Sequence, residues 1–342
     1  MGVDVVQHGQ LQRASFRMLS AILSAFLVIL GIAILYRKVD WRDIASIWLK
    51  FDPIFLGLAI LAYWMQYPIN SFRFHRVTTW VSNQPGDRVP SFGFIFRLTC
   101  SGGFVAAAAP IGLAADVAKI IALRVFGNLS TTEAARCTLF DRVIGAQWIA
   151  ILGLLTLPVQ AWGGVSSEVI IAQILLFGGV ILAVIGLLAL PSILTIIRTA
   201  FVAKLMGLFA DYRHLLLPKR SLTQMLIAIA NLASAWAALF LLLKGAGLST
   251  NPWLLAGVVP LLQLINSLPF LYMGWGGREL AMAATLGAAG GGLTVNEALA
   301  VSAAWGLTLI IAGMISGVFL IGDWQQYQLP PSSESPSPNI TQ

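Results

Sequence analysis

Charged residues are scarce in this sequence. Asp, Glu, Lys and Arg make up 10% of the 342 residues, whereas hydrophobic residues make up 58%. A soluble globular protein has about 25% charged residues, so this chain lacks the polar side chains that would cover a soluble surface. The composition predicts one all-α membrane domain over residues 1–328. The tail at 329–342 is rich in proline and serine, so we expect it to be disordered.

Histidine and cysteine are also rare, which argues against enzyme chemistry. The three histidines, His8, His75 and His214, lie near the N-terminus or in basic loops, so a buried Ser–His pair has no candidate base. Cys100 and Cys137 form no C-x-x-C pair, and the sequence contains no H-E-x-x-H motif or P-loop. We therefore expect a protein that is not an enzyme and that has no metal or cofactor.

The net charge of +7 does not indicate a nucleic-acid partner. Lys and Arg lie in loops and at the ends of hydrophobic runs, where they set membrane topology and attract anionic lipid headgroups. The sequence has no basic stripe interleaved with aromatic residues, which a nucleic-acid surface would show. The expected partners are membrane lipids with anionic headgroups, and oligomerisation is left open.

Six uncharged runs are long enough to cross a bilayer as helices, which takes about 20 apolar residues. The runs cover residues 18–36, 53–72, 143–167, 169–197, 221–243 and 298–322. A Gly163-Gly164 pair predicts the turn between the third run and the fourth. The first run lacks a convincing cleavage site, so it predicts a retained helix rather than a signal peptide.

Two further stretches are apolar but broken, and we name them the first broken stretch (residues 91–126) and the second broken stretch (residues 245–277). Proline removes a helical hydrogen bond and glycine loosens the backbone. Non-helical backbone survives at membrane depth only inside protein or along a wet cavity. Each stretch therefore predicts a broken or re-entrant helix pair; the alternative is two ordinary kinked spans in each, or roughly ten crossings in total. The predicted breaks are at Pro110, Gly112, Pro269, Gly274 and Gly276.

The two broken stretches are similar to each other. Each is followed by a Ser/Thr-x-x-Glu box, at 130–133 and at 294–297, that opens an apolar helix. This is a capping box, which explains its glutamate structurally and leaves a proton relay as the alternative. We predict two repeats, over residues 15–165 and 166–325. Because each half has an odd number of crossings, the second is inverted, which is typical of transporters.

Lysine and arginine predict the orientation. The loop at 198–220 is basic, whereas the loops near 161–168 and 244–252 have almost no basic residues. The positive-inside rule places the first loop in the cytoplasm and the other two outside, so both termini of this inner-membrane protein are expected to be cytoplasmic. The loop at 37–52 is nearly neutral and has aromatic residues at helical spacing, which predict a short interfacial helix.

Charged residues in or beside the broken stretches are the candidate lipid-binding residues, because a charge at the bilayer centre costs about 2.5–3.5 kcal/mol. We hypothesise that Lys119, Arg142 and Arg278 form a wet, positive cavity for a lipid phosphate. Asp116 and Glu279 would keep the cavity neutral when it is empty, or would meet a cationic headgroup. The predicted substrate-binding residues are Arg278, Glu279, Asp116, Lys119, Arg142, Asp141, Arg73 and Arg76.

The spacing of these residues also predicts their partners. Asp116 and Lys119 are three residues apart, so they share a helix face and can pair. The adjacent pairs Asp141-Arg142 and Arg278-Glu279 point in different directions on a helix, so we expect them to pair across helices. Arg73 and Arg76 are expected at the cytoplasmic headgroup level, with direct cargo contact as the alternative. The structural alternative for the whole set is ion pairing together with snorkelling at helix ends.

Short motifs around both breaks carry a family resemblance. They lie at 72–73, 109–112, 141–145, 268–269, 276–279 and 296–299. In combination they resemble the transmembrane region of lysylphosphatidylglycerol synthases, over nearly the whole chain to about Gly322. One departure concerns the first motif, which in the family is a denser glycine run followed by a basic residue. Here Gly112 leads to Asp116, and Lys119 supplies the basic group, so the resemblance leaves the headgroup open.

The resemblance implies a lipid-translocating function. In that family the membrane region flips aminoacylated phosphatidylglycerol across the cytoplasmic membrane, and a separate soluble domain makes this lipid. Here we expect the flipping half without a synthase domain, and stand-alone members of this kind accompany isoprenoid or polyprenyl-linked pathways. The expected function is a flippase or scramblase for a phospholipid or a polyprenyl- or isoprenoid-linked lipid. The alternative is a non-transporting membrane partner of a lipid-modifying enzyme or glycosyltransferase.

Overall fold

The described part of the chain is helical throughout. The computed structural model describes residues 41–82, 89–109, 113–194, 212–268, 271–287 and 292–321, and among these residues no strand occurs. The prediction of an all-α membrane bundle is confirmed. The predicted helix at 18–36 and the tail at 329–342 lie outside the described residues. The elements are α2 (Trp41–Leu49), α3 (Pro53–Trp64), α4 (Gln66–Val81), α5 (Phe92–Ala108), α6 (Ala114–Val125), α7 (Thr131–Trp162), α8 (Ser167–Leu194), α10 (Pro218–Gly245), α11 (Pro252–Asn266), α12 (Gly277–Met282), the π-helix η2 (Ala283–Gly287), α13 (Val295–Ser316) and the 3-10 helix η3 (Gly317–Leu320).

Four helices in the described ranges are long and apolar enough to cross a membrane: α7, α8, α10, and α13 continued by η3. They contain most of the predicted runs that start at residues 143, 169, 221 and 298. The turn predicted at Gly163-Gly164 is confirmed, because α7 ends at Trp162 and α8 begins at Ser167. A fifth candidate span joins α2 to α3 and α4 through a bend of 90°, and α2 is the short helix that the aromatic spacing predicts.

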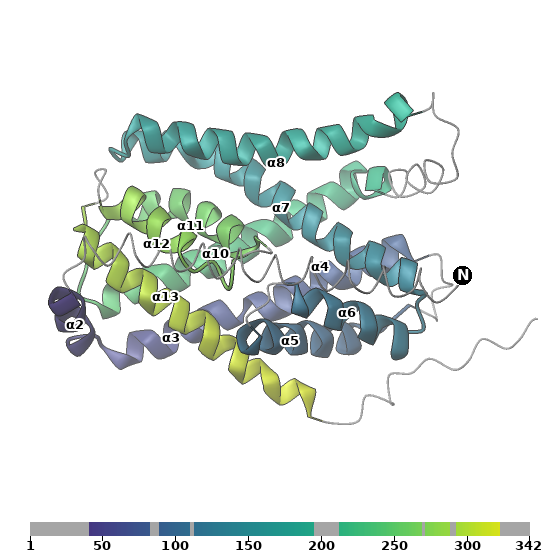
Figure 1. Ribbon diagram of the computed structural model, residues 1–342, viewed down its shortest axis with the longest axis horizontal. Coiled ribbons are helices and arrows are strands. Elements are labelled where there is room, and N and C mark those ends of the chain that lie inside the picture. The colour runs from purple at the N-terminus through teal and green to yellow at the C-terminus, as the bar shows by residue number, and fades with distance from the viewer. Residues whose placement is uncertain are drawn as a thin grey trace, which may run out of the picture.

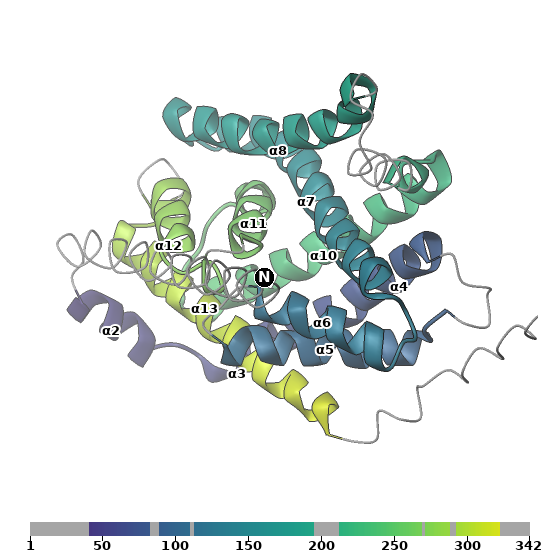
Figure 2. The same ribbon diagram turned by 45° about the vertical axis from the view of Figure 1, so that its right-hand side comes forward.

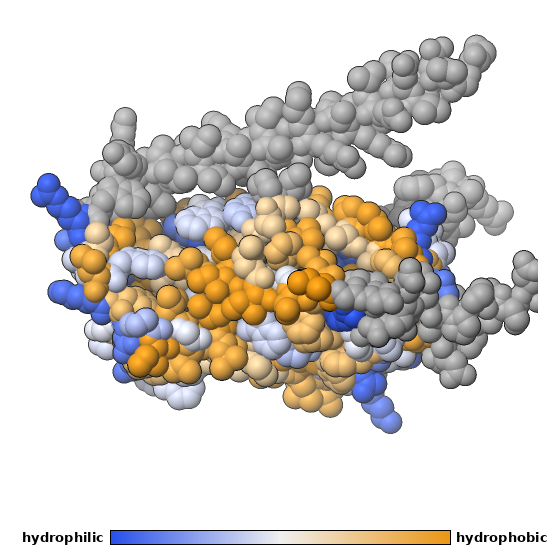
Figure 3. Space-filling model, turned by 90° about the horizontal axis from the view of Figure 1, so that it is seen from below, coloured by the Kyte–Doolittle hydropathy of each residue, from blue (hydrophilic) through white to orange (hydrophobic). Residues whose placement is uncertain are grey.

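The distribution of hydrophobic and hydrophilic residues on the surface indicates that the long axis of the molecule crosses the bilayer. The long helices run mostly along this axis (Figure 1). Hydrophobic residues cover the middle of the face in Figure 3, and hydrophilic residues gather toward its two ends. α8 packs on α7 along one edge of the bundle (Figure 1). Many of the hydrophobic side chains of α8, such as Leu175 and Leu182, are exposed. The protein is therefore a multi-pass membrane protein.

Both broken stretches form short helices on either side of a break. In the first, α5 and α6 lie side by side (Figures 1 and 2); in the second, α11 is followed by α12. The 17 residues of α5 and the 15 of α11 reach only about 22–26 Å at 1.5 Å per residue, less than the roughly 30 Å of a hydrocarbon core. These lengths favour broken pairs over two full spans in each stretch.

Two of the predicted break positions have a left-handed backbone. Gly274 and Gly276 have φ angles of +77° and +85°, in the left-handed region that glycine adopts without steric cost. Both lie in the turn that ends where α12 begins. The other predicted breaks, at Pro110, Gly112 and Pro269, lie outside the described residues.

The capping boxes are confirmed in both halves. The hydroxyl of Ser130 accepts a hydrogen bond from the backbone N–H of Glu133, whose carboxylate accepts the backbone N–H of Ser130, and α7 begins directly after Ser130. Thr294 and Glu297 make the same reciprocal contacts at the start of α13. These contacts satisfy N–H groups that the first helical turn would otherwise leave without partners.

The order and the packing of the helices also match between the halves. The series α3–α4, α5, α6, α7 corresponds in order to α10, α11, α12 with η2, and α13. α10 runs antiparallel to α3–α4: Gly245 lies beside Asp52, and Ser234 donates a hydrogen bond to the carbonyl of Ala62. The contacts between the halves also correspond. The helix before the first break, α5, packs on α13 of the other half, and the helix before the second break, α11, packs on α7 of the other half.

Candidate functional site

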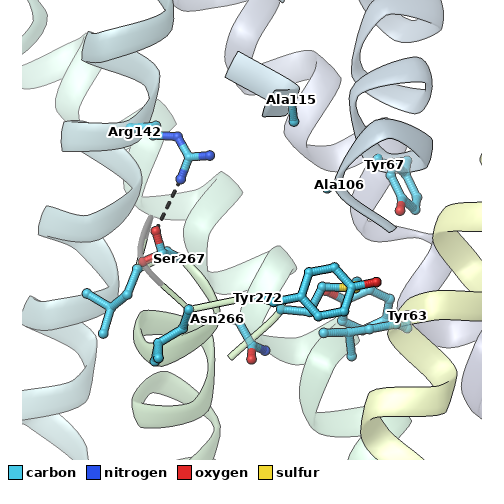
Figure 4. A pocket seen from close by; sticks show the side chains of 13 residues that line it. Tyr63, Tyr67, Ala106, Ala115, Arg142, Asn266, Ser267 and Tyr272 are labelled. Carbon is cyan, nitrogen blue, oxygen red and sulfur yellow. Dashed lines mark hydrogen bonds between the residues drawn. The ribbon is translucent and has the colours of Figure 1, made fainter. Parts of the chain in front are cut away.

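A cavity of about 520 Å³ lies where the helices of the two halves meet. Its walls come from α3 to α8, α10 and α11, and its volume is within the range of about 300–1,000 Å³ that is usual for ligand sites. A smaller chamber of about 180 Å³ adjoins it and shares Tyr63, Tyr67, Arg142 and Asn266 with it (Figure 4). Five of the eight predicted substrate-binding residues line the larger cavity. They are Arg73, Asp116, Lys119, Asp141 and Arg142.

Arg142 connects the two broken stretches. Its Nε lies 2.5 Å from the carboxylate of Asp116, in the first turn of α6. Its Nη1 donates a hydrogen bond of 3.2 Å to the carbonyl of Ser267, directly after α11 (Figure 4). The Arg142 side chain is 38% exposed, so part of the guanidinium remains open to the cavity. Asp116 thus pairs across helices, whereas the sequence spacing predicts a partner at Lys119.

Arg73 and Asp141 form a second ion pair in the cavity wall. Arg73 on α4 donates to both carboxylate oxygens of Asp141 on α7, at 2.8 and 3.2 Å. A Cβ at Gly145 would lie 2.9 Å from Arg73 Nη1, so the glycine gives the guanidinium room against α7. The prediction that Asp141 pairs across helices is confirmed. Arg73 was expected at the headgroup level, but it lies in the cavity wall because its carboxylate partner is there.

The cavity has more basic than acidic side chains. Lys119 lines it with its Nζ 5.2 Å from the ring centre of Phe74, and Gly102 makes room for the lysine stem. Three basic residues therefore face two acidic ones in the lining, a balance that attracts anions. Arg76 is exposed outside this lining and lies over the ring of Phe72, a position compatible with the predicted headgroup level.

Arg278 and Glu279 lie outside both chambers and pair with each other. The Arg278 side chain is 0% exposed, and its Nη2 and Nε donate to Glu279 Oε1 at 2.7 and 3.1 Å. Glu279 also accepts the hydroxyl of Ser302 and the backbone N–H of Gly276. The prediction that the two side chains point apart is wrong, because they pair with each other; the predicted contact across helices is present at Ser302 on α13, which both side chains contact.

This network supports the second break. Arg278 Nη1 donates to the carbonyl of Met273 at 3.3 Å, and Met273 has a φ of +48°. Its guanidinium also packs over the ring of Trp275, 4.8 Å from the ring centre. A left-handed non-glycine residue costs of order 1–3 kcal/mol and persists only where surrounding contacts hold it. Arg278 and Glu279 therefore hold the loop in place.

Neutral amides form a further part of the lining that charge-based reasoning missed. Asn231 donates to Asn70 at 2.6 Å, and Gln263 donates to Gln66 at 2.9 Å. Asn266 at the end of α11 lines both chambers. All five residues interrupt otherwise apolar runs. An amide within such a run is the sequence signal by which these residues could have been found. No group of three His, Cys, Asp or Glu side chains that could hold a metal occurs in the described ranges.

Comparison with known proteins agrees with the helical order and the break motifs. The profile described as Lysylphosphatidylglycerol synthase TM region matches residues 18–317, which covers most of the chain. No curated protein matches the chain. The match includes both broken stretches, both capping boxes and every residue of the cavity lining. The protein therefore belongs to the lysylphosphatidylglycerol synthase transmembrane region family.

Proposed function

We propose that this protein moves a phospholipid or a polyprenyl- or isoprenoid-linked lipid across the cytoplasmic membrane, with the lipid phosphate bound at Arg142. The observation that carries the proposal is the position of Arg142. Its guanidinium contacts both broken stretches, and the side chain as a whole remains 38% exposed and lines the cavity. A phosphate can therefore reach it without unfolding of any helix.

The charge balance of the cavity suits an anionic headgroup. The guanidinium plane binds phosphate oxygens through two parallel N–H donors, and Lys119 adds a second positive charge nearby. In the empty cavity Asp116 neutralises Arg142. An arriving phosphate would replace part of the contact between Asp116 and Arg142. The headgroup would thus be bound because Arg142 exchanges one anionic partner for another, and not because of a permanent net charge.

The arrangement of the halves supports translocation by alternating access. The corresponding elements α3–α4 and α10 run antiparallel, as expected for inverted repeats with a site at their interface. Rocking of one half against the other would move Ser267 relative to Arg142 and expose the cavity to one side and then to the other.

The ends of the bundle support the expected orientation. Arg76, Arg124, Arg213 and Arg220 lie toward one end of the long helices, which also carries the ends of α4, α6 and α8. By the positive-inside rule this end is cytoplasmic. Arg142 lies eleven residues after the start of α7, or about 17 Å along it at 1.5 Å per residue, so a headgroup would reach it from the cytoplasmic leaflet.

The test is lipid exchange in liposomes that contain the full chain. An anionic phospholipid labelled on its acyl chain is quenched from outside by a reductant that does not cross the bilayer, with and without an imposed membrane potential. Arg142→Ala should slow exchange at least tenfold, because a hydrogen bond to a charged group contributes about 1.5–3 kcal/mol. Arg124→Ala, an exposed arginine on α6 outside the lining, is the matched control and should leave the rate unchanged.

Two results would overturn the proposal. Exchange no faster than in protein-free liposomes under either condition would leave the non-transporting partner of a lipid-modifying enzyme as the function. Equal rates in Arg142→Ala and wild type would show that the lipid crosses elsewhere. Circular dichroism and size-exclusion profiles of each variant show that the compared proteins are folded.

A further inference from the structure

The smaller chamber ends at the loop of the second break, residues 271–276. Leu271, Tyr272 and Met273 of this loop form part of the chamber lining (Figure 4). The loop is the tip of a hairpin whose first helix, α11, begins at the end of the bundle where α10 ends, which we call the outer end. Most residues of α11 and α12 are buried. The hairpin therefore closes the chamber toward the outer end.

Two hydrogen bonds join the breaks to each other. The hydroxyl of Tyr272 donates to the carbonyl of Ala107 at 2.6 Å, and Arg142 donates to the carbonyl of Ser267. Ala107 lies in the last turn of α5 and Ser267 directly follows α11, where helix carbonyls have no partner within the helix. Each broken helix thus has a terminal carbonyl that accepts a side chain from the other half. Tyr272 is the counterpart of Arg142 in this exchange.

The contact of Tyr272 can break without leaving a charge unpaired. Its neighbours fix where the hydroxyl lies, because Leu271 is buried and the carbonyl of Met273 accepts a hydrogen bond from Arg278. The hydroxyl and the Ala107 carbonyl are both neutral, so their separation avoids the penalty of a broken buried ion pair. The loop can therefore separate from α5 together with α12, to which Arg278 ties it.

We propose that Tyr272 is a positioning residue that holds the cavity closed toward the outer end through its hydrogen bond to Ala107. This inference rests on the proposed function, because it takes the cavity as the path of the lipid headgroup. The hydrogen bond is intact while the cargo enters from the basic end, and it breaks before the cargo leaves at the outer end. Tyr272 carries no charge for this role and acts through the position of the loop.

Thiol accessibility tests which end of the bundle is open. Ala106 lines both chambers, and the buried Cys100 and Cys137 are replaced by alanine in the test chain. The thiol of Ala106→Cys is then labelled with a charged maleimide that does not cross the bilayer, in right-side-out and in inverted vesicles. With Tyr272 intact, the thiol should react mainly from one side, and that side identifies the open end.

Tyr272→Phe removes the hydroxyl and keeps the ring. Reaction of Ala106→Cys from the previously closed side should become about fivefold faster, which corresponds to about 1 kcal/mol, the net contribution of one typical hydrogen bond. Tyr212→Phe is the matched control. Tyr212 is also buried, and its hydroxyl donates to Gln147 on α7, outside both chambers. This control should leave the labelling rates from both sides unchanged.

A second probe distinguishes a specific opening from a general loosening of the fold. Cys100 is 0% exposed, on the same helix as Ala106 but outside both linings. In a chain that retains Cys100 as its single cysteine, Tyr272→Phe should leave this thiol unreactive. An unchanged labelling rate of Ala106→Cys in Tyr272→Phe would overturn the inference. An equal gain in Tyr212→Phe, or an equal gain at Cys100, would overturn it as well.

The accessibility assay and the exchange assay separate the two proposals. A faster reaction from the closed side in Tyr272→Phe, without lipid exchange by wild type, would contradict the transport function and leave the role of Tyr272 standing. Exchange that requires Arg142, with unchanged accessibility in Tyr272→Phe, would contradict the role of Tyr272 and leave the transport function standing.

Discussion

The two halves place an acid in the first turn after each break, but they surround it differently. Asp116 in α6 pairs with Arg142, which is 38% exposed at the cavity. Glu279 in α12 accepts hydrogen bonds from Arg278, Ser302 and a backbone N–H, and Arg278 is 0% exposed. Only the first pair has donors that remain available. Under the proposed function, the pair in the first half therefore belongs to a ligand site, whereas the pair in the second half holds the loop of its break in place.

The comparison extends to the helix that follows each capping box. Gly306 holds the same position after its box in α13 that Arg142 holds in α7. A Cβ at Gly306 would lie 2.5 Å from Arg278 Nη2. Each half therefore brings a guanidinium to the same place, from α7 in the first and from α12 in the second. The second guanidinium packs over the ring of Trp275 and lies outside the cavity lining.

Removing the buried guanidinium should have the largest effect on stability. Arg278→Ala leaves Glu279 buried without its charged partner, and breaking a buried ion pair in this way costs about 3–5 kcal/mol. Arg142→Ala also leaves a buried acid, Asp116, but it removes a guanidinium that is 38% exposed and makes fewer hydrogen bonds than Arg278, so it should cost less than Arg278→Ala. Melting temperatures of the purified proteins in one detergent check the order. Equal losses of stability in the two variants would contradict a structural role for Arg278 that Arg142 does not share.

A substitution in the backbone of the second break should have an intermediate effect on stability. Gly274 has a φ of +77°, and a Cβ there would lie 2.2 Å from Asn266 Oδ1. Gly274→Ala should therefore cost about 1–3 kcal/mol, since it adds a clash to a left-handed backbone.

Gly247→Ala is the control for backbone conformation alone. Gly247 has a φ of +68° with no atom within 4 Å of an added Cβ, so only the left-handed penalty of about 1–2 kcal/mol applies. If Gly274→Ala loses no more stability than Gly247→Ala, the loop at the second break can move to accommodate the added Cβ. That result would contradict a loop held rigidly by Arg278 and Glu279.

The features that followed from the sequence depend on local signals. The spans reflect continuous apolar runs, the turn at Gly163 reflects a glycine pair, and the capping boxes reflect a motif whose contacts lie within four residues. The breaks at Gly274 and Gly276 could be expected for the same reason, because a positive φ is a property of the residue itself.

The features that did not follow depend on tertiary packing. Helical spacing predicted Lys119 as the partner of Asp116, but the rotation of α6 against α7 brings Arg142 to it. The burial of Arg278 depends on the space left at Gly306, 28 residues further along the chain. The amides were overlooked because only charged residues were treated as costly at membrane depth, although an unpaired amide is costly as well.

Substitutions in the capping boxes should have the smallest effect on stability. They also test whether the two halves are alike apart from their ion pairs. Ser130→Ala and Thr294→Ala each remove one side-chain acceptor from an N-cap and should each cost about 1 kcal/mol. The two costs should agree within about 0.5 kcal/mol, because the reciprocal contacts at α7 and α13 have the same geometry. Amide hydrogen exchange at the first turn of each helix, measured together with the melting temperature, locates the loss. A clearly larger loss at one box would mean that the two halves already differ where α7 and α13 begin. The contrast between Arg142 and Arg278 would then reflect a general difference between the halves and not a division of roles between two corresponding positions.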